Sequence, residues 1–124
     1  MKDGKHVILY VDDDPDFRDS MRTVLEANGY LFLEAASGEE GLRQFKQQKP
    51  DLVILDLMME EIDTGTSMVR DLKLGGCEAP ILVVSSVGEA LRQSTDISEL
   101  GLAGVLQKPV DFDGLLGMIK LKLE

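Results

Sequence analysis

The sequence predicts an α/β fold in which helices cover both faces of a five-stranded parallel sheet. Two observations lead to this prediction. Short apolar runs, which are typical of strands buried on both faces, alternate with amphipathic helical stretches along the chain. The chain has 124 residues, of which 44% are hydrophobic and 29% charged. That length and composition suit one globular domain that folds without disulfides or a structural metal.

Five apolar runs predict the strands. In chain order they are residues 6–11, 30–35, 52–55, 80–84 and 105–107. Runs of this length that are rich in β-branched residues are typical of strands. They are far too short to span a bilayer, so we expect no membrane segment.

The stretches between these runs predict helices, several of them with recognisable caps. Asp14 and Pro15 suit the cap and the first position of the first helix, which ends before Gly29. A capping box that begins at Ser37 opens a second helix to about residue 47. Further helices are expected to end near residue 74 and to occupy residues 88–100 and 111–123. Five strand–helix units with right-handed crossovers fit the doubly wound, flavodoxin-like (βα)5 strand order 2-1-3-4-5.

Charge and cysteine content argue against several classes of protein. The formal net charge of −10 opposes direct binding to nucleic acid or to an anionic membrane surface. The single cysteine, Cys77, has no partner for an internal disulfide, and no Cys/His cluster has zinc-site spacing. The first residues do not resemble a secretory signal. We therefore expect a cytoplasmic protein with one domain over residues 1–124 and no output domain.

Polar side chains follow four of the five predicted strands. In an open parallel sheet, ligands bind at the carboxyl ends of the strands, around the point where the strand order reverses. The residues at these ends are Asp12 and Asp13 after the first strand, Asp56 after the third, Ser85 and Ser86 after the fourth, and Lys108 after the fifth. Because the first and third strands are neighbours in this order, we expect the carboxylates of Asp12, Asp13 and Asp56 to lie close together.

The residue types at this edge indicate phosphoryl chemistry. Three neighbouring carboxylates repel one another unless some are protonated or a cation lies among them. Oxygen ligands select a hard cation, and Mg²⁺ binds a few carboxylates while it keeps several waters. Such a site, with the charge of Lys108 and the hydroxyl of Ser85, can stabilise a phosphoryl group during transfer. A carboxylate can be the nucleophile and form an acyl phosphate, and Asp56 is the central candidate.

Four motifs resemble the response-regulator receiver family. They are Val-Asp-Asp-Asp-Pro at residues 11–15, Pro-Asp-Leu-Val-Ile-Leu-Asp-Leu-Met-Met at residues 50–59, Pro-Ile-Leu-Val-Val-Ser at residues 80–85 and Gln-Lys-Pro at residues 107–109. Each motif alone is weakly specific, but together they are strongly specific, because they occur in order and at the family's spacing. The resemblance covers essentially the whole chain and implies a phosphorylation switch of two-component signalling.

The resemblance also implies a metal site. Asp56 matches the aspartate that accepts the phosphoryl group, and Asp12 and Asp13 match the acidic pair that holds Mg²⁺, with Mn²⁺ as an alternative. In the family, residues matching Asp13 and Asp56 usually bind the ion directly and the residue matching Asp12 acts through water. The backbone carbonyl of Met58 matches a further ligand.

Three residues match the family's phosphoryl-binding positions. Ser85 matches the switch hydroxyl, which is more often Thr, and Lys108 matches the characteristic lysine. Ser86 matches the small residue whose backbone N–H faces the phosphoryl group. The resemblance implies that Ser85 moves toward the bound phosphoryl group.

Two segments depart from the family's pattern. Receivers often continue after the phosphoacceptor with Pro-Gly-Met-Asp-Gly, whereas residues 60–65 read Glu-Glu-Ile-Asp-Thr-Gly. This change should alter a loop that borders the site, and its extra acids can either add to cation binding or slow an anionic phosphodonor. Relatives commonly carry Tyr or Phe three residues before the lysine, where this chain has Val105. Val105 cannot report phosphorylation through rotation of an aromatic ring.

The leading functional hypothesis is a signalling receiver. A sensor histidine kinase or a histidine phosphotransfer protein would supply the phosphoryl group to Asp56. The domain would catalyse only its own phosphorylation and slow dephosphorylation, so we do not expect a turnover enzyme. The switch would alter the surface formed by residues 88–123, which an unidentified protein partner would read; a phosphorylation-dependent homodimer is one such output.

Two other hypotheses stay open. The chain can be a phosphorylation-independent protein-binding scaffold of receiver ancestry, which Val105 and the altered loop favour but the retained site residues oppose. It can also be a metal-dependent hydrolase with an aspartyl nucleophile. Phosphatases of the haloacid dehalogenase type carry a second acid two residues after the nucleophile, where this chain has Met58, so this hypothesis fits poorly.

Overall fold

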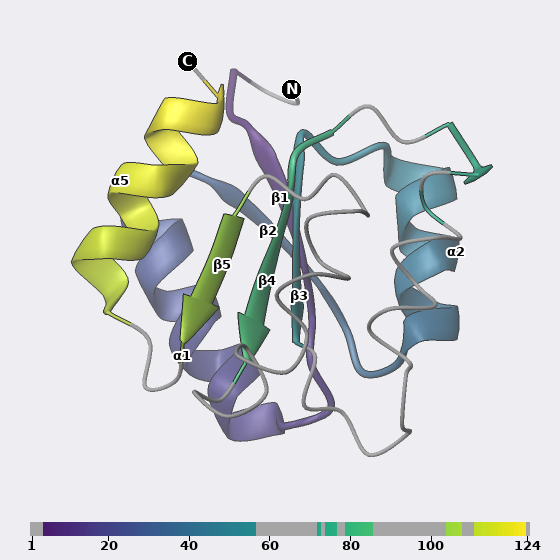
Figure 1. Ribbon diagram of the computed structural model, residues 1–124, viewed down its shortest axis with the longest axis horizontal. Coiled ribbons are helices and arrows are strands. Elements are labelled where there is room, and N and C mark those ends of the chain that lie inside the picture. Colours follow the sequence, from purple (N-terminus) through teal and green to yellow (C-terminus); the bar gives the residue numbers. More distant parts are fainter. Residues whose placement is uncertain are drawn as a thin grey trace.

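The computed structural model describes residues 4–56, 72, 74–76, 79–85, 104–107 and 111–123. Their strands and helices are drawn in Figure 1: β1 (Val7–Val11), α1 (Pro15–Ala27), β2 (Leu31–Ala35), α2 (Gly38–Gln48), β3 (Leu52–Asp56), β4 (Ile81–Ser85), β5 (Gly104–Gln107) and α5 (Phe112–Leu123). The strands pair in parallel in the order β2-β1-β3-β4-β5, which confirms the predicted topology. Within these ranges, no helix is both long and apolar enough to cross a membrane.

Alternate residues of the central strands face opposite layers of the molecule. Ile8 and Tyr10 of β1 belong to a buried cluster with residues of α1 and α5, whereas Leu9 and Val11 belong to a second cluster packed by α2. Figure 1 shows the same arrangement, with α1 and α5 on one side of the sheet and α2 on the other. Every residue of β1 and β3 is buried, as expected for a parallel sheet that helices cover on both faces.

Both predicted helix caps are present. Asp14 accepts a hydrogen bond from the N–H of Asp16 at 2.9 Å, and Ser37 accepts one from the N–H of Glu40 at 3.2 Å. The carboxylate of Glu40 accepts a hydrogen bond from the N–H of Ala36, one residue before the partner that a capping box uses. Because α1 begins directly after Asp14, the chain turns away from the sheet there and leaves the two preceding aspartates at its edge.

The ends of several strands differ from the predictions by one residue. β3 and β4 run through Asp56 and Ser85, which we predicted to follow these strands. A polar residue ends an apolar run in the sequence, but the backbone ladder can continue through it because the ladder uses only main-chain groups. β1, β2 and β4 begin one residue later than predicted, and β5 begins one residue earlier. The predicted helix at residues 88–100, the loop at residues 60–65 and most of the helix expected to end near residue 74 lie outside the described residues.

At the opposite end of the sheet, Asp51 joins β3 to β1. Its Oδ2 accepts a hydrogen bond from the N–H of Val7 at 2.7 Å, and its own N–H donates to the Val7 carbonyl at 2.7 Å. His6 Nδ1 lies 3.8 Å from the same carboxylate oxygen, so the chain's histidine is at the end of the sheet away from Asp12. Burial raises the pKa of Asp51, but the hydrogen bond from Val7 and the charge of His6 act in the opposite direction, and the net shift lowers it.

Replacing Asp51 by Asn is therefore expected to lower the free energy of unfolding by about 1 kcal/mol near neutral pH. The folded-state pKa lies below the unfolded value of about 3.9. The stability that ionised Asp51 contributes is thus present above about pH 3.9 and is lost as the pH falls through the folded-state value. Urea unfolding at a series of pH values should show the difference from wild type shrinking below about pH 4. A difference that stays constant across that range would contradict the prediction.

Candidate functional site

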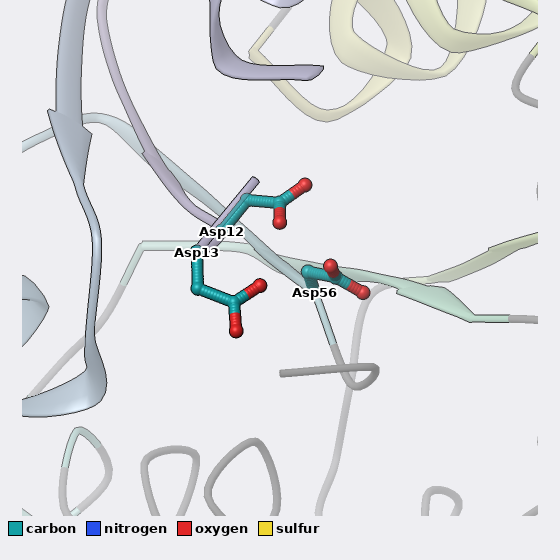
Figure 2. A group of neighbouring side chains, drawn as sticks. All are labelled: Asp12, Asp13 and Asp56. Atoms are coloured by element: carbon teal, nitrogen blue, oxygen red, sulfur yellow. The ribbon is translucent and has the colours of Figure 1, made fainter. Parts of the chain in front are cut away.

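The register of the sheet brings the predicted carboxylates to one edge. Val11 of β1 pairs with Leu55 of β3, so the next residues along the two strands, Asp12 and Asp56, follow at adjacent positions. Asp13 comes directly after Asp12, and Figure 2 shows the three side chains side by side at the strand ends. One oxygen from each carboxylate lies within 4.8 Å of the others. The cluster that the strand order predicts is therefore present.

Two of these carboxylates are shielded from water. Asp12 is 0% exposed and Asp56 is 1% exposed, and they are the buried charged side chains in the described part of the chain. Asp13 is half-buried. Burial of a charge costs free energy unless the charge is paired, and neighbouring carboxylates add mutual repulsion. A cation at this position would reduce the mutual repulsion of the three carboxylates.

The donor set fits a hard divalent cation. All three side chains offer carboxylate oxygens, the ligand type that Mg²⁺ prefers. Mg²⁺ binds oxygen at about 2.0–2.1 Å, so two ligand oxygens on one ion lie roughly 3–4 Å apart. The observed oxygens, all within 4.8 Å of one another, need only small side-chain movements to reach that spacing. The residues present can therefore hold Mg²⁺.

Two residues outside the predicted set of site residues, Tyr10 and Arg18, hold Asp12. The hydroxyl of Tyr10 donates a hydrogen bond to Asp12 Oδ2 at 2.5 Å. The guanidinium of Arg18 donates to the backbone carbonyl of Asp12 at 2.8 Å and to the carboxylate of Glu34 at 3.2 Å. Tyr10 could have been found from its spacing, because it lies two residues before Asp12 in the same strand run and so on the same face. The Arg18 contact depends on how α1 packs against the sheet, and no pattern in the neighbouring sequence predicts that packing.

Tyr10 keeps its proton in this environment. Burial is the main cause that raises its pKa far above the ordinary value near 10, and the hydrogen bond to Asp12 raises it further. The charges of Asp12 and Asp56 act in the same direction. The phenol is therefore a hydrogen-bond donor to Asp12 throughout the physiological pH range.

Among the other predicted site residues, the structure places the backbone of Ser85. Val84 of β4 pairs with Asp56, so Ser85 is one position further along the neighbouring strand, at the same edge of the sheet. Met58, Ser86 and Lys108 lie outside the described residues, and their roles stay predictions.

Comparison with known proteins assigns this arrangement to a family. The sequence profile of the response regulator receiver domain matches residues 8–120. The transcriptional regulatory protein GlrR of Escherichia coli K12 is 34% identical over 117 residues, which are 94% of this chain and 26% of GlrR. The response regulator MprA of Mycobacterium leprae is 34% identical over 116 residues, which are 94% of this chain and 50% of MprA. The chain thus spans half or less of the length of these curated relatives.

Solved structures agree with the sequence comparison. The crystal structure of a CheY-like response regulator receiver domain protein from Methanospirillum hungatei JF-1 has a TM-score of 0.88 and 28% sequence identity. The match covers 97% of this chain and 94% of that chain. A response regulator receiver domain protein from Clostridium thermocellum has a TM-score of 0.86 and 27% identity, over 95% of this chain and 94% of that chain.

Proposed function

Since the chain belongs to the response regulator receiver domain family, a family of signalling domains, we propose that it is a phosphorylation switch with Asp56 as its phosphoacceptor. The observation that carries this proposal is the position of Asp56 itself. Its carboxylate ends a buried strand and lies within 4.8 Å of the Asp12 and Asp13 carboxylates, so that the proposed nucleophile and the proposed metal ligands lie at one edge of the sheet.

The carboxylates of Asp12, Asp13 and Asp56 would hold Mg²⁺ or Mn²⁺, with the backbone carbonyl of Met58 as a further ligand. The bound ion would neutralise negative charge on the phosphoryl oxygens. Asp13 and Asp56 would contact the ion directly, and Asp12 would act through water. This division of roles suits Asp12, whose two carboxylate oxygens already accept hydrogen bonds from the hydroxyl of Tyr10 and the N–H of Asp14.

Transfer would take place by in-line displacement at phosphorus. An oxygen of Asp56 forms the new P–O bond while the P–N bond to the donor's phosphohistidine breaks, and the electron pair leaves with the imidazole. The product is an acyl phosphate. Water later attacks the phosphorus, releases inorganic phosphate and restores the Asp56 carboxylate.

Lys108 and Ser85 would bind the transferred group. Arg18, the described basic side chain nearest in sequence to the aspartates, is already engaged by the Asp12 carbonyl and Glu34. This engagement supports Lys108, which follows β5, as the source of positive charge at the phosphoryl group. Ser85 would donate its hydroxyl and Ser86 its backbone N–H.

The phosphoryl donor would be a sensor histidine kinase or a histidine phosphotransfer protein in the cytoplasm. Movement of Ser85 would alter the surface formed by residues 88–123, and a protein partner or a second copy of the chain would read the change. The net charge of −10 supports a protein partner over direct contact with DNA. GlrR, which is named as a transcriptional regulatory protein, is more than three times as long as this chain, and that activity is its own.

Incubation with acetyl phosphate and Mg²⁺ is expected to add one phosphoryl group, as measured by intact-protein mass. The adduct should be absent when EDTA replaces Mg²⁺ and absent from Asp56→Asn. Asp51→Asn is a matched control, because it makes the same change directly before the opposite end of β3, and it should still form the adduct. An adduct that persists in Asp56→Asn, or no adduct in wild type, would overturn the proposal.

A second candidate is a protein-binding scaffold that works without phosphorylation. The position of Val105 favours it. Val105 lies in β5 and pairs with Val83 of β4, where relatives commonly carry the aromatic ring that accompanies switching. A partner that binds wild type and Asp56→Asn with equal affinity, in the presence or absence of acetyl phosphate, would favour the scaffold.

A further inference from the structure

We propose that Tyr10 is a positioning residue that holds the Asp12 carboxylate in the orientation in which the aspartate cluster binds its divalent cation. This inference rests on the metal site of the proposed function and assigns that site a residue outside its set of ligands. The observation behind it is a hydrogen bond of 2.5 Å from the Tyr10 hydroxyl to Asp12 Oδ2.

Asp12 is held at each of its polar groups. Its N–H donates to the carbonyl of Ala35 at 3.0 Å, and its own carbonyl accepts from the guanidinium of Arg18 at 2.8 Å. Oδ1 accepts from the N–H of Asp14 at 3.0 Å, and Oδ2 accepts from the Tyr10 hydroxyl. The first two contacts fix the backbone, and the last two fix the carboxylate.

Both carboxylate contacts are needed to set the direction of the carboxylate plane. A single hydrogen bond to Oδ1 leaves the group free to turn about its final torsion, which is a broad sp³–sp² rotor. The second donor, on the other oxygen, removes this freedom. The carboxylate of Asp12 is then held in one orientation, with one oxygen within 4.8 Å of an oxygen of Asp13 and an oxygen of Asp56.

Tyr10 is a rigid donor. It is 0% exposed, and its ring packs against Phe17 and Phe32, with ring centroids 6.1 and 6.4 Å away. Because the ring is held on two sides, the position of its hydroxyl is already fixed before an ion binds. Binding of the ion therefore costs no further side-chain freedom at Tyr10. By contrast, the Asp14 N–H belongs to the turn that leads into α1.

Partners of this kind tune the affinity of a metal site. Groups that hydrogen-bond to metal ligands typically change metal affinity by 10–100-fold when they are removed. A tyrosine in a core can also have a merely structural role, in which the carboxylate serves only to satisfy a buried hydroxyl. In that case, loss of the hydroxyl would change stability but not the affinity for the ion.

The test compares Mg²⁺ affinity, measured by isothermal titration calorimetry, between wild type and Tyr10→Phe. The variant keeps the ring and its packing, and we expect it to bind Mg²⁺ about tenfold more weakly. Tyr30→Phe is the matched control, because it removes the hydroxyl of the chain's other tyrosine, and it should bind Mg²⁺ as wild type does. Thermal unfolding without metal will show that each variant is folded.

A double-mutant cycle tests whether Tyr10 acts through Asp12. In the Asp12→Asn background, we expect Tyr10→Phe to change Mg²⁺ affinity by less than about twofold. Equal Mg²⁺ affinity of wild type and Tyr10→Phe would overturn the inference, and so would an undiminished effect of Tyr10→Phe in the Asp12→Asn background. Either result leaves the proposed function intact as long as wild type binds Mg²⁺. Failure of wild type to bind the ion would overturn both.

Discussion

Replacing Asp56 by Asn is expected to stabilise the metal-free protein by about 2 kcal/mol and to abolish most of its stabilisation by Mg²⁺. Asp56 is 1% exposed and its carboxylate lies within 4.8 Å of the other two carboxylates. Two like charges about 4 Å apart repel by roughly 1 kcal/mol in water and 4 kcal/mol near a protein surface. Asn has nearly the same shape as Asp, so the variant removes this repulsion without opening a cavity.

Urea unfolding in EDTA and in excess Mg²⁺ measures both parts of this prediction. Wild type should gain stability with Mg²⁺, because an ion that binds only the folded state stabilises it, and Asp56→Asn should gain much less. Asp51→Asn is the informative control, since the same substitution is expected to destabilise the protein at the other end of β3. A metal-free Asp56→Asn protein that is less stable than wild type would contradict the prediction, because it would show that favourable interactions of the Asp56 carboxylate outweigh the repulsion within the cluster.

Replacing Asp13 by Asn is expected to weaken Mg²⁺ binding by at least about a hundredfold, the upper end of the range for groups that only support a ligand. In the proposed site Asp13 contacts the ion directly, so its loss removes both a ligand and one negative charge. Calorimetric titration with Mg²⁺ gives the affinity. The variant should remain folded, because Asp13 is half-buried and its removal also relieves repulsion in the cluster.

Asp14→Asn provides the neighbouring control for this prediction. Asp14 is exposed and caps α1, a role in which Asn is as effective as Asp. It should bind Mg²⁺ within about threefold of wild type, the change expected from a small loss of local negative charge. Equal losses of Mg²⁺ affinity in Asp13→Asn and Asp14→Asn would mean that the ion is attracted by the local negative charge in general and is not coordinated by specific ligands.

The position of the site could be predicted because it follows from strand order. The apolar runs before Asp12 and Asp56 identify two buried strands, and the doubly wound order makes these strands neighbours. The cap at Asp14 could also be predicted, because capping depends on a few adjacent residues. The cap depends on neighbouring residues and the position of the site depends on strand order, and the sequence pattern is enough to predict both.

The contacts that hold the site could not be predicted in the same way. In the sequence, Tyr10 has the pattern of an ordinary core residue within an apolar run. Its ring does pack in the core, and only its hydroxyl contacts Asp12. Arg18 reaches the Asp12 carbonyl only because α1 packs beside β2, where Glu34 pairs with it. The predicted ends of β3 and β4 were one residue too early, because the apolar run stops one residue before the main-chain hydrogen bonding between the strands does.

The most direct test of the central claim is to locate the phosphoryl group. After incubation with acetyl phosphate and Mg²⁺, borohydride reduces an aspartyl phosphate to homoserine with loss of phosphate, which peptide mass mapping can assign to one position. We predict homoserine at position 56, dependent on Mg²⁺ and absent when acetyl phosphate is omitted. Homoserine at position 12 or 13, or none at any position, would contradict the assignment of Asp56 as the phosphoacceptor.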